Sequence, residues 1–179
     1  MKQTLCICMI GLALIGYAAA QDSSPDEKAA TQKLDALLGK WRGEGKFLDT
    51  SQTKRGNVTG DIDCTWSPQH NFVICEQLVT DRNGKHKRLS VYSYNEKEKN
   101  YDIRTMVDPG LPPFYAVFTI QGDIWTITSS NQAKGKKVEY RTIIDHSSSD
   151  VQLSKTEYSD DGGAHWTVML QVTTKRIAR

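Results

Sequence analysis

The pattern of apolar and polar side chains changes near residue 39. Ser24 and Pro25 are typical of a helix N-cap and of the first helical position. Leu34 and Leu37 then fall on one side of a short helix. Gly39 can end that helix in the left-handed conformation. We therefore expect a short N-terminal helix followed by structure of a different kind.

After Gly39, apolar and polar residues alternate, which is typical of strands with one buried face. Turn residues divide this part into about ten strand-like runs: 40–48, 57–66, 72–80, 87–94, 101–107, 114–121, 124–129, 136–144, 151–158 and 166–174. The connections are too short for crossover helices, so neighbouring strands should pair antiparallel. A sheet of this size removes its exposed edges by closing. The predicted fold is all-β, an up-and-down antiparallel barrel of about ten strands preceded by the short helix.

Two turns set the expected strand pairing. Asn83 and Gly84 predict a type I′ hairpin turn, which needs positive φ at both central residues. This turn places Tyr92 beside Cys75, and the following hairpin adds Ile103 beyond Tyr92. We take this aromatic side of the sheet as the interior.

The second turn, at Gly122 and Asp123, sets Ile120 opposite Trp125 on an apolar face. The last strand repeats the alternation, with its apolar side at Trp166, Val168, Leu170 and Val172. Both patterns indicate a sheet with a dry inner side and a wet outer side.

Two cysteines lie in neighbouring strands. A hairpin centred on Gln69 and His70 places Cys64 directly opposite Cys75. Directly opposite residues are close enough for a disulfide, so the pair is a predicted bridge. Two free, buried thiols are the alternative.

The amino terminus is typical of an export signal. Lys2 precedes an apolar stretch over 5–17, and Ala18 to Ala20 provide the small residues that signal peptidase requires. We expect cleavage after residue 20; a retained membrane anchor is the alternative. The predicted organisation is a signal peptide over 1–20, a linker and short helix over 21–36, and a barrel domain over 37–179. The mature protein would be periplasmic or secreted, with no stable membrane insertion.

Composition and charge narrow the function only slightly. The chain has 179 residues and a net charge of +2, too small for a nucleic-acid binder. The histidines fall in predicted turns without metal-ligand spacing, so no metal site is expected: His70, His86, His146 and His165. No catalytic motif stands out, and we expect a protein that is not an enzyme. One Asp-box pattern is interpreted as a structural hairpin device: Ser159, Asp161, Gly163 and Trp166.

One face of the predicted sheet carries charged residues. Asp63 lies beside Glu76, with Val91 and then Arg104 further across the sheet. These side chains could be a solvated outer face, or an acid–base group of an enzyme if they converge in a concavity.

Several short patterns resemble a known group of barrels. They are G-x-W-x-G-x-G over 39–45, W-x-x-x-x-x-F-V-x-x-E over 66–76, V-Y-x-Y-x-x-x-x-K-x-Y over 91–101 and D-G-G-x-x-W over 161–166. Together they resemble the nitrobindin branch of the lipocalin-like (calycin) barrels, and more closely an exported bacterial family of unknown function in that superfamily. Nitrobindins carry heme on a His near the end of the last strand; residues 169–174 contain no His, so no cofactor is expected here.

We expect the barrel to bind a small hydrophobic ligand without transforming it, because a barrel of about ten strands is wide enough to leave a cavity. An interaction module with a filled interior is the main alternative. The predicted ligand-binding residues are Trp66, Tyr92, Tyr94, Ile103, Phe118, Trp125 and Tyr140.

Overall fold

The structure is a computed structural model that describes residues 25–108, 113–133 and 135–178. The predicted signal peptide and most of the loop after Asp108 therefore lie outside the described residues. The helices are α1 (Pro25–Gln32) and the 3-10 helix η1 (Lys33–Leu37). The strands are β1 (Gly39–Phe47), β2 (Gly56–Trp66), β3 (Val73–Asp81), β4 (Gly84–Asn95), β5 (Asn100–Val107), β6 (Phe114–Gln121), β7 (Ile124–Ala133), β8 (Lys136–Asp145), β9 (Val151–Ser159) and β10 (Thr167–Ala178).

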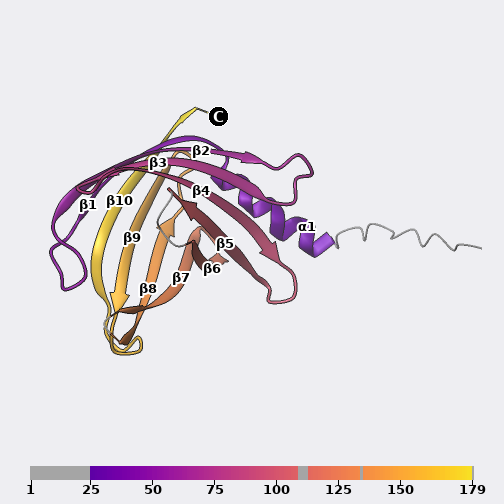
Figure 1. Cartoon of the computed structure of the whole chain (residues 1–179). Helices are drawn as coiled ribbons and strands as arrows, with labels where there is room; N and C mark the ends of the chain where they lie inside the picture. Colours follow the sequence, from indigo (N-terminus) through magenta and orange to yellow (C-terminus); the bar gives the residue numbers. More distant parts are fainter. Residues whose placement is uncertain (1–24, 109–112, 134, 179) are drawn as a thin grey trace, which may run out of the picture.

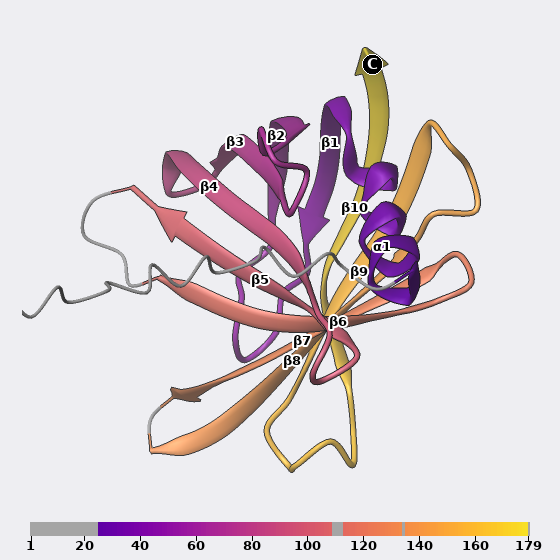
Figure 2. The same cartoon turned by 90° about the vertical axis from the view of Figure 1, so that its right-hand side faces the viewer.

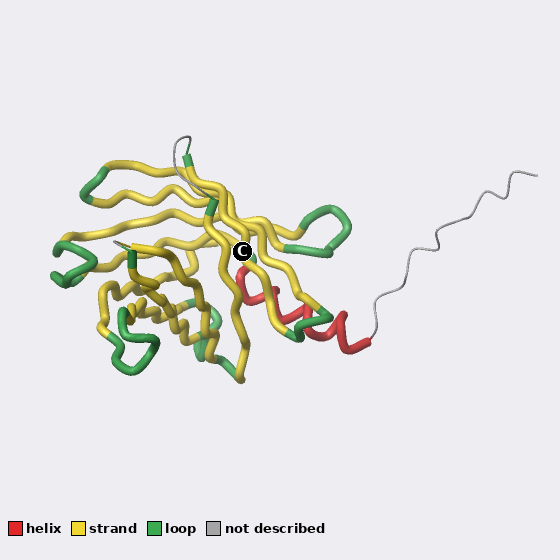
Figure 3. Tube along the Cα trace, turned by 60° about the horizontal axis from the view of Figure 1, so that its bottom comes forward, coloured by secondary structure: helices red, strands yellow, loops and turns green. Residues whose placement is uncertain are grey.

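The ten strands form one closed antiparallel barrel in which each pairs with its neighbours in sequence and β1 pairs with β10. This confirms the predicted fold class. Figure 1 shows β7 to β10 arching across one side of the molecule, while β1 to β4 lie over the top. In Figure 3 yellow strands make up most of the chain and are joined by short green loops.

The helical segment covers one end of the barrel, which we call the helix end; the opposite end is the far end. Leu34, from η1, is fully buried among side chains of β2, β3, β5, β6 and β7. Figure 2 shows α1 beside the converging strands. Leu38 ends the helix in an extended conformation, and Gly39 has φ +100° as the first residue of β1, so the helix ends before the glycine that was expected to terminate it. Among the described residues, no helix is both long and apolar enough to cross a bilayer.

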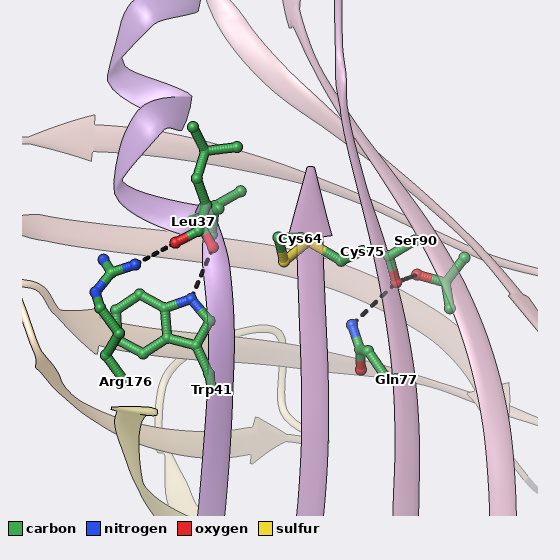
Figure 4. Close-up of a disulfide and its surroundings, with 9 residues drawn as sticks. Leu37, Trp41, Cys64, Cys75, Gln77, Ser90 and Arg176 are labelled. Carbon is green, nitrogen blue, oxygen red and sulfur yellow. Dashed lines mark hydrogen bonds between the residues drawn. A yellow bond between two sulfur atoms is a disulfide. The ribbon is translucent and has the colours of Figure 1, made fainter. Parts of the chain in front are cut away.

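Trp41 joins the helix, the first strand and the last strand. Its indole nitrogen donates to the Leu37 carbonyl at 2.8 Å, and the Arg176 guanidinium lies 3.8 Å above the ring centre. Arg176 also donates to the Leu38 carbonyl (Figure 4). Trp41 is only 2% exposed, so this contact closes the helix end of the β1–β10 seam.

The predicted disulfide is confirmed. Cys64 and Cys75 are directly opposite across β2 and β3, with Cα atoms 4.1 Å apart, and their sulfur atoms are bonded. Both side chains are buried in the wall of the helix end (Figure 4). The bridge therefore ties together two strands that already pair, beneath the helix.

The predicted pairing of β3 with β4 is wrong by two residues. Only Gly84 of the expected turn has positive φ, and Asp81 pairs with Gly84. The cause is the Asp81 carboxylate, which accepts the Asn83 backbone N–H at 2.7 Å and starts the turn one residue earlier. As a result Cys75 lies beside Ser90 rather than Tyr92. The predicted neighbours Tyr92 and Ile103 do pair.

The expected side-chain direction at the start of β10 is also wrong. A bulge between Val168 and Leu170 reverses the alternation. Val168 pairs with the outward-facing Glu157, and the Trp166 ring contacts Arg141 on the outer surface. Beyond the bulge, Leu170 faces inward as expected, because it lies in the same row as Phe47.

Gly45 lies on β1 directly opposite Val172 of β10. A Cβ atom there would lie 2.3 Å from the Gln171 carbonyl oxygen, whereas at Gly60 the nearest atom, the Leu78 carbonyl oxygen, would be 3.7 Å away. We expect Gly45→Ala to lower the free energy of unfolding by about 2 kcal/mol because backbone must move. Gly60→Ala is the matched control and should be close to neutral. Urea denaturation of both variants tests this, and equal stability would contradict the seam contact.

Candidate functional site

A series of aromatic rings in contact crosses the barrel interior at the helix end. Tyr94 lies 5.2 Å from Tyr101, Tyr101 lies 4.7 Å from Phe118, and Phe118 lies 5.2 Å from Trp125. Four successive strands each supply one ring, because the hairpins between them bring inward-facing positions side by side. The Trp125 ring then stacks on His146 at 4.3 Å. This ring series forms a continuous aromatic wall.

The helix is fastened to the ring series through Tyr101. Its hydroxyl donates to the Ala30 carbonyl at 2.9 Å. Burial raises the pKa of Tyr101 to about 12, with the neighbouring Tyr94 adding to the effect. The phenol therefore keeps its proton, and this donor, throughout the physiological range.

The predicted ligand-binding residues are brought together to different degrees. Ile103, Phe118 and Trp125 are buried in one core cluster. Trp66, Tyr92 and Tyr94 pack against that cluster and are partly exposed. Tyr140 lies closer to the far end, opposite Ser129 and Tyr158. The set therefore runs from the helix end toward the far end of the same interior.

Polar side chains also face the interior, beside the disulfide. The Gln77 amide nitrogen donates to the Ser90 hydroxyl at 3.3 Å, and Ser90 shares a 2.8 Å hydrogen bond with Thr105 (Figure 4). Ser90 and Thr105 are buried, whereas Gln77 is partly exposed. Sequence reasoning missed this group. The sequence did contain a signal for it: every second side chain of a strand points to the same face, so Gln77 lies on the same face as Cys75.

Inward-facing side chains beyond the ring series are covered to different degrees, and Val138 and Tyr158 are buried. Phe47, Leu170, Ile127 and Tyr140 all occupy inward-facing positions, yet each remains partly exposed. Because their side chains point inward, the surface they leave accessible faces the barrel interior or its mouth. Some apolar surface that faces inward is therefore left accessible.

The charged residues weighed as an acid–base group do not converge. Asp63 and Glu76 are directly opposite each other on the outer surface, and Lys40 lies 3.5 Å from the Asp63 carboxylate. Glu76 is followed across the sheet by Leu89, because of the corrected pairing of β3 with β4. Arg104 lines a separate hollow on β5 and β6. This arrangement resembles a solvated outer face.

Grooves cross the outer surface of the described part of the barrel. One, of about 850 Å³, crosses β1, β2 and β7 to β10. The other, of about 680 Å³, holds Asp63 and Glu76 beside the apolar side chains of Leu78, Leu89 and Met106. Both are lined mainly by outward-facing side chains, but the second also includes Ile62 and Gln77, whose positions face inward.

The Asp-box residues form a hairpin brace, as the sequence indicates. Asp161 accepts the His165 backbone N–H at 3.0 Å and the Ser159 hydroxyl at 2.7 Å. Gly163 has φ +90°, and its carbonyl accepts the Trp166 indole N–H at 3.0 Å. The bonds donated to its carboxylate hold the pKa of Asp161 well below its usual range. Ser159, Asp161 and His165 therefore serve the turn and do not form a nucleophile pair.

His146 is an unusual buried group at the helix end. Its Nε2 atom is buried and has no hydrogen-bond partner within the described residues. Burial lowers the pKa of His146 to about 4, although the nearby carboxylates of Asp145 and Asp123 act in the opposite direction. The imidazole is therefore neutral at pH 7. Across the described ranges, His, Cys, Asp and Glu side chains do not gather in threes as metal ligands would.

Comparisons with known proteins give structural relatives only. No protein-family model matches the chain, and no curated protein matches it. The crystal structure of Rv2717c from M. tuberculosis aligns with a TM-score of 0.56 and 16% identity, covering 87% of this chain and 99% of that one. The S-type phycobiliprotein lyase CPES from Guillardia theta aligns with a TM-score of 0.53 and 14% identity, covering 84% and 96%.

The chain has a lipocalin-like calycin fold. At these identities the likeness establishes the fold alone. Within this calycin barrel, the ring series and the polar group beside it are the features that offer a small molecule both stacking surface and hydrogen bonds.

His146 gives a test of the helix-end packing. Its pKa is about 4 when folded and 6.5 in the unfolded chain, so unfolded molecules take up the proton first as the pH falls. The free energy of unfolding should therefore decrease between pH 6.5 and pH 4, and His146→Phe should reduce that decrease. Denaturation series at each pH measure this, and NMR titration of the ring gives the midpoint directly. A midpoint at or above 6.5 would contradict the buried stacking on Trp125.

Proposed function

We propose that this protein binds a small, largely apolar molecule inside its barrel and does not transform it. The ligand would lie on the accessible side of the aromatic wall. Apolar walls would supply affinity, and phenol groups would orient the ligand. The proposed ligand-binding residues are Trp66, Tyr92, Tyr94, Ile103, Phe118, Trp125 and Tyr140.

The observation that carries this proposal is the accessible apolar surface within a closed barrel. Phe47, Ile127 and Leu170 point inward yet stay partly exposed. A filled core would bury such side chains, since apolar surface is unfavourable in water. The neighbour CPES is named as a phycobiliprotein lyase, and that name is consistent with a calycin barrel that handles a small molecule.

The proposal includes export. A signal peptide over 1–20, followed by a linker and helix over 21–36 and a barrel domain over 37–179, would deliver the protein to the periplasm or the medium. The Cys64–Cys75 bridge supports this, because disulfides persist in oxidising compartments. The finer kinship, to the nitrobindin branch or to the exported bacterial family, rests on the sequence patterns alone.

A second candidate function is an interaction module. Met106 is 56% exposed and Tyr115 66% exposed, and both lie on the outer surface of β5 and β6. Leu78 and Val117 are exposed beside them on β3 and β6. Contiguous exposed apolar side chains often mark a protein contact. This reading favours the outer surface over the interior as the functional part.

Binding of N-phenyl-1-naphthylamine, a neutral apolar dye, separates the two candidates. We expect the protein to enhance the dye's fluorescence, and Tyr140→Ala to weaken binding about fivefold to tenfold through loss of ring contact. Tyr115→Ala, the control on the outer surface, should have no effect. Loss of binding in Tyr115→Ala alone would favour the interaction module, and no binding by the unaltered protein would refute the interior site. Extraction of native protein followed by mass spectrometry would identify a resident ligand.

A further inference from the structure

An apolar strip crosses the outer surface of the barrel from β3 to β6. Its members come from four successive strands and lie in or beside the second groove: Leu78, Leu89, Met106 and Tyr115. Leu78 is 38% exposed, Met106 56% and Tyr115 66%. Single exposed apolar side chains are common, but a strip that continues from strand to strand is typical of a contact surface.

Charged side chains line the groove beside this strip, and most of them already have a partner. Asp61 pairs with Arg42 at 2.8 Å, and Lys40 lies 3.5 Å from the Asp63 carboxylate. The Asp108 carboxylate accepts a backbone N–H at 2.8 Å. The charges of these groups are therefore compensated within the chain.

Glu76 and Lys87 are the outward-facing exceptions. Both are exposed, and within the described ranges neither side chain makes an ion pair. Glu76 is directly opposite Leu89, and Lys87 is directly opposite Leu78. The acid and the base therefore lie on opposite sides of the line that joins the two leucines. Glu76 also faces Asp63 across β2 and β3, which is an unfavourable arrangement of like charges.

We propose that this face binds a second copy of the chain, in a two-fold symmetric dimer whose axis runs along the line from Leu78 to Leu89. Rotation about that axis places each leucine against the same leucine of the partner. It also places Glu76 against the partner's Lys87, and Lys87 against the partner's Glu76. Both charges then gain an opposite charge, and the apolar strip between them is removed from water. The dimer gives the outer surface a partner and does not depend on the interior site.

The shape of the barrel wall suits such a contact. The wall of a twisted barrel is hyperboloid, so it curves in opposite senses along and across the strands. Two surfaces of this kind fit together when they are crossed, because the raised direction of one enters the hollow direction of the other. The proposed axis is diagonal to the strands, so the strands of the two copies would cross steeply, as in orthogonal sheet packing. The groove of each copy would then be filled by the other.

Sedimentation equilibrium of the protein without ligand tests the arrangement by charge reversal. We expect a dimer, and Glu76→Lys should raise its dissociation constant about tenfold or more, because like charges then meet at two symmetric places. Lys87→Glu should have the same effect. Combining both substitutions should restore the dimer, since opposite charges meet again with their positions exchanged. Glu44→Lys, an equal change of charge in the other groove, is the control and should leave the dimer unchanged.

The apolar strip is tested separately by Met106→Glu. This variant should weaken the dimer about tenfold or more, because it places a charge in the apolar centre of the contact. Leu153→Glu is the matched control, since Leu153 is 55% exposed on β9, and it should leave the dimer unchanged. Thermal unfolding of each variant, expected to resemble that of the unaltered protein, shows that folded barrels are compared.

The outcomes also separate this proposal from the interior site. A monomer at protein concentrations up to about 1 mM would overturn it. So would a dimer that the two single reversals leave unchanged, or a loss that the double variant does not correct. Loss of the dimer in Glu44→Lys or Leu153→Glu alone would assign the contact to another face. Because binding of N-phenyl-1-naphthylamine is measured on its own, failure of the dimer leaves the interior site standing, and failure of dye binding leaves the dimer standing.

Discussion

Closure of the sheet between its first and last strands is the constraint on which the remaining structure depends. The β1–β10 seam joins parts of the chain that are far apart in sequence, so its formation carries the largest loss of chain entropy. Trp41 and Arg176 secure that seam at the helix end, and Gly45 allows the two backbones to approach. An open sheet would have no enclosed interior, and the aromatic side chains on its inner face would be exposed to water.

The helix and the aromatic wall divide the interior into two unequal parts. Leu34 and Tyr101 join the helix to the rings, so the helix end is packed like an ordinary core. Toward the far end, inward-facing side chains such as Phe47 and Leu170 keep accessible surface. A molecule held there would contact aromatic rings on one side and the polar group around Gln77 on another. Under the proposed function, recognition would be confined to one half of the barrel.

Local residue chemistry predicted much of this fold, and it failed where one extra residue enters a strand or turn. The pairing of Cys64 with Cys75 followed from a single hairpin centre, and the structure has it. The pairing of β3 with β4 was not predicted correctly. Residue preferences place the turn at Asn83 and Gly84, but the hydrogen bond to the Asp81 carboxylate starts it earlier. The bulge before Leu170 has no strong local signal, since it arises from how β10 meets both neighbours. Gln77 was overlooked although its inward direction follows from its spacing to Cys75, because its partners Ser90 and Thr105 come from strands brought together only by folding.

The place of α1 has a consequence for how the molecule can be attached to other things. Because Ala30 and Leu34 are bound to the barrel, anything joined ahead of Pro25 departs from the covered end of the cylinder. A tether, a fused domain or a surface anchor added there would leave the opposite mouth unobstructed. The protein could thus be immobilised through its amino terminus while the far end of the barrel stays unmodified.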